Sequence, residues 1–152
     1  MKALVILLVI SGQFVLARAN AGLVAPETDR LTLGGITIGQ SEASVVATLG
    51  KPRHRKKELD FFLPITLVYR GLVVSLDEQG VGSVLSTSKK FCTPAKICPG
   101  MTHAQVTKVY GPSDAYERDR AIFRDYLWDD GCWLRLKFQA DTVSSVETTC
   151  SP

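Results

Sequence analysis

The chain has 152 residues, of which 45% are hydrophobic and 22% are charged, a composition that indicates a globular protein rather than a disordered one. Its formal net charge is +3, but Lys2 and Arg18 lie in the first 21 residues, and without them 16 basic residues face 15 acidic ones. This even balance excludes a strong nucleic-acid footprint and argues against an electrostatic membrane binder. The length suits one domain or two very small ones.

Residues 1–21 have the pattern of a secretory signal peptide. A basic start at Lys2 precedes a short apolar core, and small residues allow cleavage after Ala19 or Ala21. A transmembrane anchor is the alternative, but the core falls short of the ~20 apolar residues that a span needs. No cysteine lies near either cut to carry a lipid. We therefore expect a periplasmic or secreted protein without a transmembrane segment in its mature form.

After a lead-in over residues 22–30, the chain contains a degenerate internal repeat, with repeat 1 over residues 31–90, a linker over 91–99 and repeat 2 over 100–152. Residues 38–52 align with residues 99–112 at an offset of 61. In each copy a Ser or Thr supplies an N-cap, apolar residues follow at helical spacing, and a Gly followed by a Pro ends the helix. The pattern predicts a two-turn helix at the start of each copy, after a leading strand over 31–38 that bends at two glycines.

Alternating apolar residues predict three strands after each helix. In repeat 1 the strands cover 65–69, 72–76 and 81–86, and in repeat 2 they cover 123–128, 133–138 and 143–146. The resulting fold class is α+β, with two tandem units of a helix and an antiparallel meander. Both helices are expected to pack on one face of a continuous sheet. Residues 51–57 and 114–120 are expected to be loops.

Four cysteines remain in the mature chain, and an even count in an exported protein indicates two disulfides. Cys92 and Cys98 lie close together across a short loop. Cys132 and Cys150 flank a predicted hairpin that would place them opposite each other. These positions favour the pairs 92–98 and 132–150, whereas a four-cysteine zinc site lacks the usual close ligand pairs.

At this level of detail the chain resembles a known family. The order of the helix motif in residues 97–112, then Leu127-Trp128, then the strands at 134–138 and 143–146 is similar to β-lactamase inhibitory protein and the SmpA/OmlA (BamE) envelope domain. The resemblance implies an exported α/β protein that binds other proteins with a sheet face and loops. Two functions follow from it: inhibition of a secreted or envelope enzyme by steric occlusion, or assembly and maintenance of the cell envelope.

The chain departs from both branches of that family. It lacks the lipobox cysteine of the envelope lipoproteins, and Cys92 and Cys98 fall in the linker rather than within a repeat. The resemblance therefore carries the general expectation of protein binding by occlusion or scaffolding, and neither specific function.

The candidate binding residues are mainly aromatic and basic. If Leu134 and Leu136 face the helices, Trp133, Arg135 and Lys137 must face the other way, and a Trp beside an Arg is typical of a protein-binding hot spot. Trp128 is the stronger core candidate of the two tryptophans. The set that we expect to contact another protein is Trp133, Arg135, Lys137, Tyr126, Trp128, Tyr116 and, from a basic loop, Arg53, Arg55 and Lys56.

Catalysis has little support in the sequence. His54 lies in the basic loop and His103 in the first turn of a helix, and neither has a nucleophile and a carboxylate nearby in sequence. No nucleotide-binding or metalloprotease motif is present, and His103 with Asp114 or Glu117 lacks metal-ligand spacing. We expect no enzyme activity, cofactor or metal; a small exported enzyme is the remaining alternative.

Overall fold

The structure, a computed structural model of the chain, describes residues 31–59, 61–127 and 131–150. These residues form two short helices and ten strands: β1 (Thr32–Leu33), β2 (Ile36–Thr37), α2 (Glu42–Leu49), β3 (His54–Lys57), β4 (Ile65–Tyr69), β5 (Leu72–Leu76), β6 (Val81–Ser86), α3 (His103–Tyr110), β7 (Ala115–Arg118), β8 (Ala121–Leu127), β9 (Cys132–Gln139) and β10 (Thr142–Cys150). Eight strands make one antiparallel sheet in the order β3-β4-β5-β6-β10-β9-β8-β7, and β1 and β2 pair separately.

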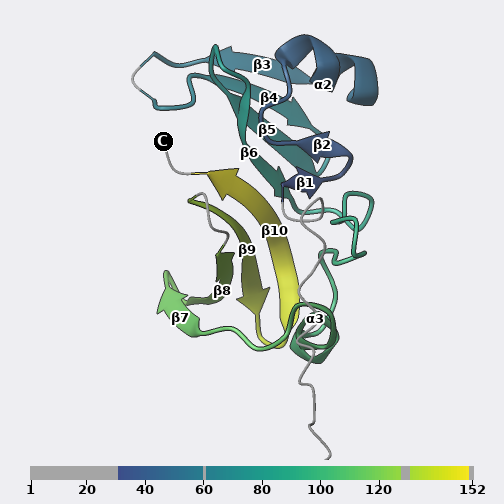
Figure 1. Cartoon of the computed structure of the whole chain (residues 1–152), viewed down its shortest axis with the longest axis vertical. Helices are drawn as coiled ribbons and strands as arrows, with labels where there is room; N and C mark the ends of the chain where they lie inside the picture. The colour runs from purple at the N-terminus through teal and green to yellow at the C-terminus, as the bar shows by residue number, and fades with distance from the viewer. Residues whose placement is uncertain (1–30, 60, 128–130, 151–152) are drawn as a thin grey trace, which may run out of the picture.

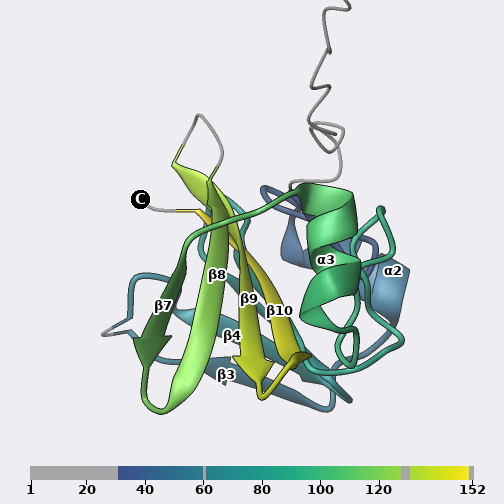
Figure 2. The ribbon, with the colours of Figure 1, turned by 90° about the horizontal axis from the view of Figure 1, so that it is seen from below.

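The sheet is strongly curved, and both helices lie on its outer, convex side (Figure 1). The view from below shows the same arrangement, with α2 and α3 on one side of the strands (Figure 2). The opposite side of the sheet carries no helix in the described part of the chain. We call this side the open face, because it is where side chains of the strands can meet another molecule.

Local sequence explains where each helix begins and ends. The hydroxyl of Ser41 accepts a hydrogen bond from the backbone of Ser44, and Thr102 forms a reciprocal capping box with Gln105. Gly50 and Gly111 follow the two helices with φ of 80° and 82°, a conformation that glycine adopts without strain. The predicted caps are confirmed at both ends of both helices.

The core lies between the sheet and the helices. Cross-strand pairing places Leu67, Val74 and Val84 in one row, which continues through Thr148 to Leu134. All of these are fully buried, and Val45 of α2 and Val106 of α3 pack into the same apolar cluster. One core therefore spans both halves of the sheet.

The predicted fold class is wrong: the protein is mainly β rather than an α+β repeat. Each helix has only eight residues, whereas the segments at 51–57 and 114–120 that we expected to be loops contain the strands β3 and β7. Both are edge strands whose side chains are all exposed, so they lack the alternation that marks a strand buried on one face. The division into repeats 31–90 and 100–152, with its linker and signal peptide, stays a prediction from the sequence.

Both predicted disulfides are confirmed. Cys92 bonds Cys98, and Cys132 bonds Cys150 across the β9–β10 pair. Two disulfides are typical of proteins that mature outside the reducing cytosol, which supports the expectation of an exported chain. Among the described residues, no helix is both long and apolar enough to cross a membrane.

Candidate partner-binding face

The open face carries the side chains that alternate with the buried ones along each strand. In β9 the buried residues Leu134 and Leu136 alternate with the partly exposed residues Trp133, Arg135 and Lys137. The register extends this face in rows across the sheet. Its main members are His54, Lys56, Thr66, Val68, Val73, Ser75, Ser83, Leu85, Tyr116, Asp125, Leu127, Trp133, Arg135, Lys137, Glu147 and Thr149. Phe123 lies on the same side but is buried beneath the ring of Tyr116.

A polar network fixes the centre of the β8–β9 part of this face. Arg135 donates from Nε and Nη2 to the two carboxylate oxygens of Asp125 at 3.0 and 2.8 Å, and the hydroxyl of Tyr116 donates to the same carboxylate at 3.0 Å. The hydrogen bonds to Asp125 raise the pKa of Arg135, against an opposing effect of partial burial. Partial burial and the bond to Asp125 raise the pKa of Tyr116. Both pKa shifts therefore keep the guanidinium of Arg135 charged and the phenol of Tyr116 neutral at neutral pH.

Aromatic rings surround this network. The guanidinium of Arg135 lies 5.5 Å from the centroid of Trp133, and Tyr116 stacks on Phe123 with centroids 5.6 Å apart. Lys137 places its Nζ 5.8 Å from the centre of the Phe123 ring. Cation–π contacts of this kind hold both partners in place. The result is a preorganised patch of rings and charges rather than a set of free side chains.

The face continues across the junction between the two halves of the sheet. Glu147 of β10 lies opposite Arg135 of β9, and its carboxylate accepts a hydrogen bond from the Ser83 hydroxyl of β6 at 3.0 Å. A row of alternating charge thus runs from Asp125 through Arg135 to Glu147. Such a row favours a partner that carries the opposite charge at each of these positions.

Trp133 has a polar group without a protein partner. Its indole Nε1 is buried and makes no hydrogen bond among the described residues, although a buried donor normally has an acceptor. The ring itself stays partly exposed. Residues 128–130 lie outside the described part of the chain, so the prediction for Trp128 stays open.

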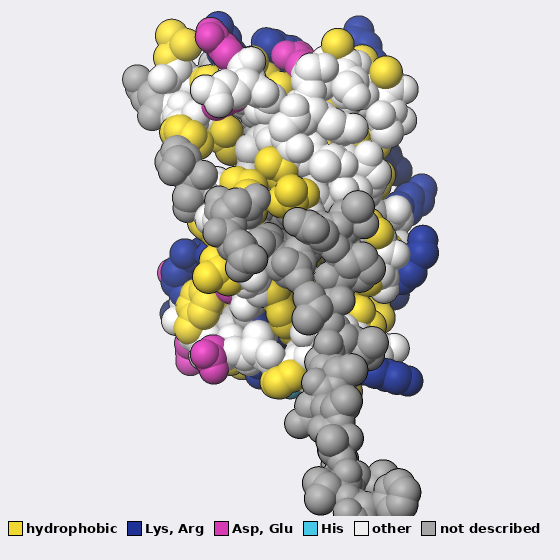
Figure 3. All heavy atoms as spheres, viewed as in Figure 1, with side chains coloured by type: hydrophobic (Ala, Val, Ile, Leu, Met, Phe, Trp, Pro, Cys, Tyr) yellow, Lys and Arg dark blue, Asp and Glu magenta, His cyan; other side chains and the backbone are white. Residues whose placement is uncertain are grey.

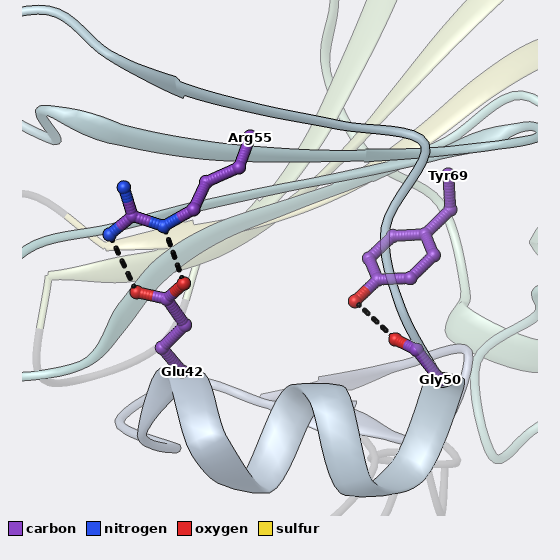
Figure 4. A network of polar contacts seen from close by, with 4 residues as sticks. All are labelled: Glu42, Gly50, Arg55 and Tyr69. Atoms are coloured by element: carbon purple, nitrogen blue, oxygen red, sulfur yellow. Dashed lines mark hydrogen bonds and ion pairs between the residues drawn. The ribbon is translucent and has the colours of Figure 1, made fainter.

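Two of the predicted contact residues lie elsewhere. Tyr126 packs in the core on the helix side, where its hydroxyl donates to the carbonyl of Gly111 at 3.2 Å and its ring meets Tyr110 at 5.3 Å. Arg55 turns towards the helix side and donates to Glu42 of α2 at 2.7 and 3.0 Å (Figure 4). The placement of both residues follows from strand alternation, because each lies opposite a buried residue of the helix side, Arg55 opposite Leu67 and Tyr126 opposite Leu134.

The ion pair between Arg55 and Glu42 helps to hold α2 against the sheet. The hydrogen bond from Arg55 lowers the pKa of the Glu42 carboxyl, and at the other end of α2 the hydroxyl of Tyr69 donates to the carbonyl of Gly50 at 3.2 Å (Figure 4). Together these bonds attach α2 to β3 and β4. Arg53 and Lys56 are both exposed, in or beside the edge strand β3 and at the end of the sheet opposite β7.

The two histidines lie in different halves of the molecule. His54 is exposed in β3, while His103 contacts Thr107 at 3.1 Å and meets the edge of Phe138. Within the described residues, no group of three or more His, Cys, Asp or Glu side chains is placed to hold a metal ion. A cavity of about 250 Å³ lies between residues 38–39, Phe62 and Leu63 of the β3–β4 loop, the β5–β6 turn and Cys150.

Sequence reasoning missed Asp125 and Phe123, which organise the patch. Both belong to the same face as Arg135 and Lys137, because β8 pairs with β9 in the register Asp125↔Arg135 and Phe123↔Lys137. The alternation of Phe123, Asp125 and Leu127 could have assigned them to one face of β8. Their partners on β9 could not be predicted, because the pairing register depends on the turn between the two strands. Sequence reasoning also gave no role to Leu59, Phe61 and Phe62, which are 80%, 63% and 59% exposed in the β3–β4 loop.

No family model matches the chain, and no curated protein sequence matches it. Three solved structures share the fold. An extracellular protein containing an SCP domain from Bacillus anthracis str. Ames is 14% identical, with a TM-score of 0.55. A cysteine-rich secretory protein from Staphylococcus aureus subsp. aureus Mu50 is 13% identical, with a TM-score of 0.52. A DUF4309 family protein from Bacillus subtilis subsp. subtilis str. 168 is 16% identical, with a TM-score of 0.54.

The extent of the match differs between these neighbours. It covers 75% of this chain but only 44% of each of the first two proteins, and 77% of this chain and 83% of the third. At such identities the likeness concerns the fold alone. The neighbours correct the family expectation: they are SCP-domain and DUF4309 proteins, and none is a β-lactamase inhibitory protein or an SmpA/OmlA-type domain. Short helix-capping motifs carried that resemblance, and unrelated folds share them because they follow from local helix chemistry.

Proposed function

We propose that this chain is an exported protein, periplasmic or secreted, that binds another protein through its open face and acts by steric occlusion. The observation that carries the proposal is the network of Tyr116, Asp125, Arg135 and Trp133. It lies on the face of the curved sheet that carries no helix in the described part of the chain. Aromatic rings and arginines dominate the energetics of protein interfaces. Here they are held in position before any partner arrives, which lowers the entropy lost on binding.

The partner that suits this face is a protein with complementary charges around an apolar contact. The ring of Trp133 is partly exposed, so an apolar side chain of the partner could pack on it. Glu147 and Arg135 alternate in sign beside it and would set the register of the complex. A secreted or envelope enzyme covered in this way would lose access to its substrate.

A capture experiment tests the proposal. The processed, oxidised chain is immobilised and exposed to envelope and culture-supernatant extracts, in parallel with Trp133→Ala and Arg135→Gln. Ile122→Ala is the matched control, because Ile122 is 44% exposed and lies on β8 in the row that faces the helices. We expect the open-face variants to bind the purified partner at least about 30-fold more weakly, as for a hot-spot residue, and the control to bind normally.

The captured protein is then assayed with and without the chain. Loss of its activity at saturating chain supports occlusion, while unchanged activity shows that the face is a scaffold and overturns that mechanism. Equal affinity of the wild type and both open-face variants contradicts the proposal as a whole.

A further inference from the structure

The loop between β3 and β4 carries large apolar side chains that nothing in the described structure covers. Leu59, Phe61 and Phe62 are 80%, 63% and 59% exposed, and we call these three residues the β3–β4 tip. The backbone N–H of Glu58 donates to the carbonyl of Pro64 at 2.8 Å, which closes the base of the loop. Figure 3 shows hydrophobic side chains gathered around this end of the molecule. The sheet therefore ends in an apolar projection rather than a polar turn.

Basic residues surround the tip. The segment 51–63 contains five lysines and arginines and two acidic residues, Glu58 and Asp60, of which Asp60 lies outside the described residues. Every side chain of β3 is exposed. The strand β3 lies at the edge of the sheet. Its successive side chains point to opposite faces of the hairpin, so basic side chains lie on both faces. Arg55 is bound to Glu42, while Arg53, Lys56 and Lys57 have no ion pair among the described residues.

An apolar tip with two lysines beside it, Lys56 and Lys57, neither in an ion pair among the described residues, matches the surface of an anionic bilayer. Aromatic rings prefer the headgroup region of a membrane, and lysines and arginines at that level gain from the negative surface potential of the lipids. The chain as a whole is close to neutral, so this attraction is local. The edge strand at the other end of the sheet, β7, has mixed charge with Glu117 and Arg118, which would orient the protein with β3 towards the lipid.

We propose that the β3–β4 hairpin docks the protein on an anionic membrane surface. Phe61 and Phe62 enter the interfacial layer, and Lys56 and Lys57, at the loop end of β3, contact the lipid headgroups. A single loop of this size gives reversible attachment and does not span the bilayer. The proposal rests on the tip and the two lysines beside it, and it does not use the Tyr116–Asp125–Arg135–Trp133 network of the open face.

Vesicle co-sedimentation tests this docking. The processed chain is mixed with vesicles of phosphatidylcholine alone, or with vesicles in which about a third of the lipid is phosphatidylglycerol. We expect binding to the anionic vesicles only. Replacing Phe61 and Phe62 together by serine should lower the partition coefficient at least about tenfold. The double change Lys56→Gln and Lys57→Gln should lower it about 30-fold, because each of the two lysines contributes a similar attraction to the anionic headgroups.

Matched controls separate docking from general effects of charge and hydrophobicity. Lys89→Gln with Lys90→Gln removes the same charge from exposed positions outside the hairpin, and Ile122→Ser removes another exposed apolar side chain; both should bind like the wild type. Circular dichroism confirms the fold of each variant. Trp133→Ala should bind vesicles normally, so failure here and failure of the open-face proposal are distinguishable.

Three results overturn the docking proposal. These are no binding to anionic vesicles, equal binding to both vesicle types, and binding that the phenylalanine substitutions leave unchanged. If the wild type does not bind vesicles and the tip variants no longer bind a protein that the wild type captures, the tip belongs to a protein interface instead.

Discussion

Two arginine–carboxylate pairs in this protein have the same bidentate geometry but different surroundings. Arg55 and Glu42 keep side-chain exposures of 45% and 32%, whereas Arg135 and Asp125 keep 22% and 29%. Arg55 lies on an edge strand, where water and salt screen its charge. Arg135 lies on an inner strand beside the ring of Trp133, and Asp125 also holds Tyr116. The same contact should therefore be stronger at the centre of the open face.

A pair of double-mutant cycles tests this difference. For Asp125→Ala and Arg135→Ala we expect a coupling free energy of about 1–2 kcal/mol, because charge-assisted hydrogen bonds in a partly buried site are only partly offset by water. For Glu42→Ala and Arg55→Ala we expect a smaller coupling. Urea unfolding monitored by circular dichroism measures both. Equal couplings in the two cycles would show that the open-face network is no more preorganised than a surface ion pair.

At the scale of the elements, glycine allows two tight connections that differ in their surroundings. Gly71 joins β4 to β5 with φ of 82°, and an added Cβ would lie 2.5 Å from the Cβ of Ser88. Gly35 has φ of 81° in the β1–β2 turn, with nothing within 4 Å of the added atom. The backbone strain of an alanine is thus the same at both positions, and only Gly71 adds a collision.

Alanine substitutions separate the two effects. Gly35→Ala should lower the free energy of unfolding by about 1 kcal/mol, the cost of a left-handed conformation for a residue with a Cβ. Gly71→Ala should lower it by about 2–3 kcal/mol, because the neighbouring strand end must also move. The midpoints of urea unfolding measure both losses of stability, provided that the dependence of the free energy of unfolding on urea concentration is unchanged. A Gly71 variant as stable as the Gly35 variant would mean that Ser88 moves aside without cost.

The elements also show what local sequence can and cannot predict. Helix caps, apolar strands and both disulfides follow from interactions between near neighbours, and these predictions hold. The strands β3 and β7 were missed because an exposed edge strand is recognised only by its partner in the sheet. The partner of Arg135 was missed for a related reason, since Asp125 reaches it only through the β8–β9 register. Trp133, Arg135 and Lys137 could be assigned to one face because strand alternation alone decides it.

At the scale of the whole molecule, the two halves of the sheet share one hydrogen-bonded seam and one core. The strands β6 and β10 pair at four positions, from Val146↔Ser86 to Thr149↔Ser83. The apolar cluster on the helix side includes residues from both halves, such as Val74 and Leu134. A half separated from this seam would expose the unpaired edge of β6 or β10 and part of its core. The two halves should therefore unfold together rather than as two independent domains.

The positions of the tryptophans make this cooperativity measurable. Both tryptophans, Trp128 and Trp133, belong to the second half of the chain, so their fluorescence reports that half, while far-ultraviolet circular dichroism reports the whole sheet. Val74 is fully buried in the first half, and Val74→Ala should lower the free energy of unfolding by about 2 kcal/mol. In urea, fluorescence and circular dichroism should shift to the same lower midpoint. If the dichroism transition splits while the fluorescence transition stays in place, the seam between β6 and β10 does not couple the two halves, and each half is a folding unit of its own.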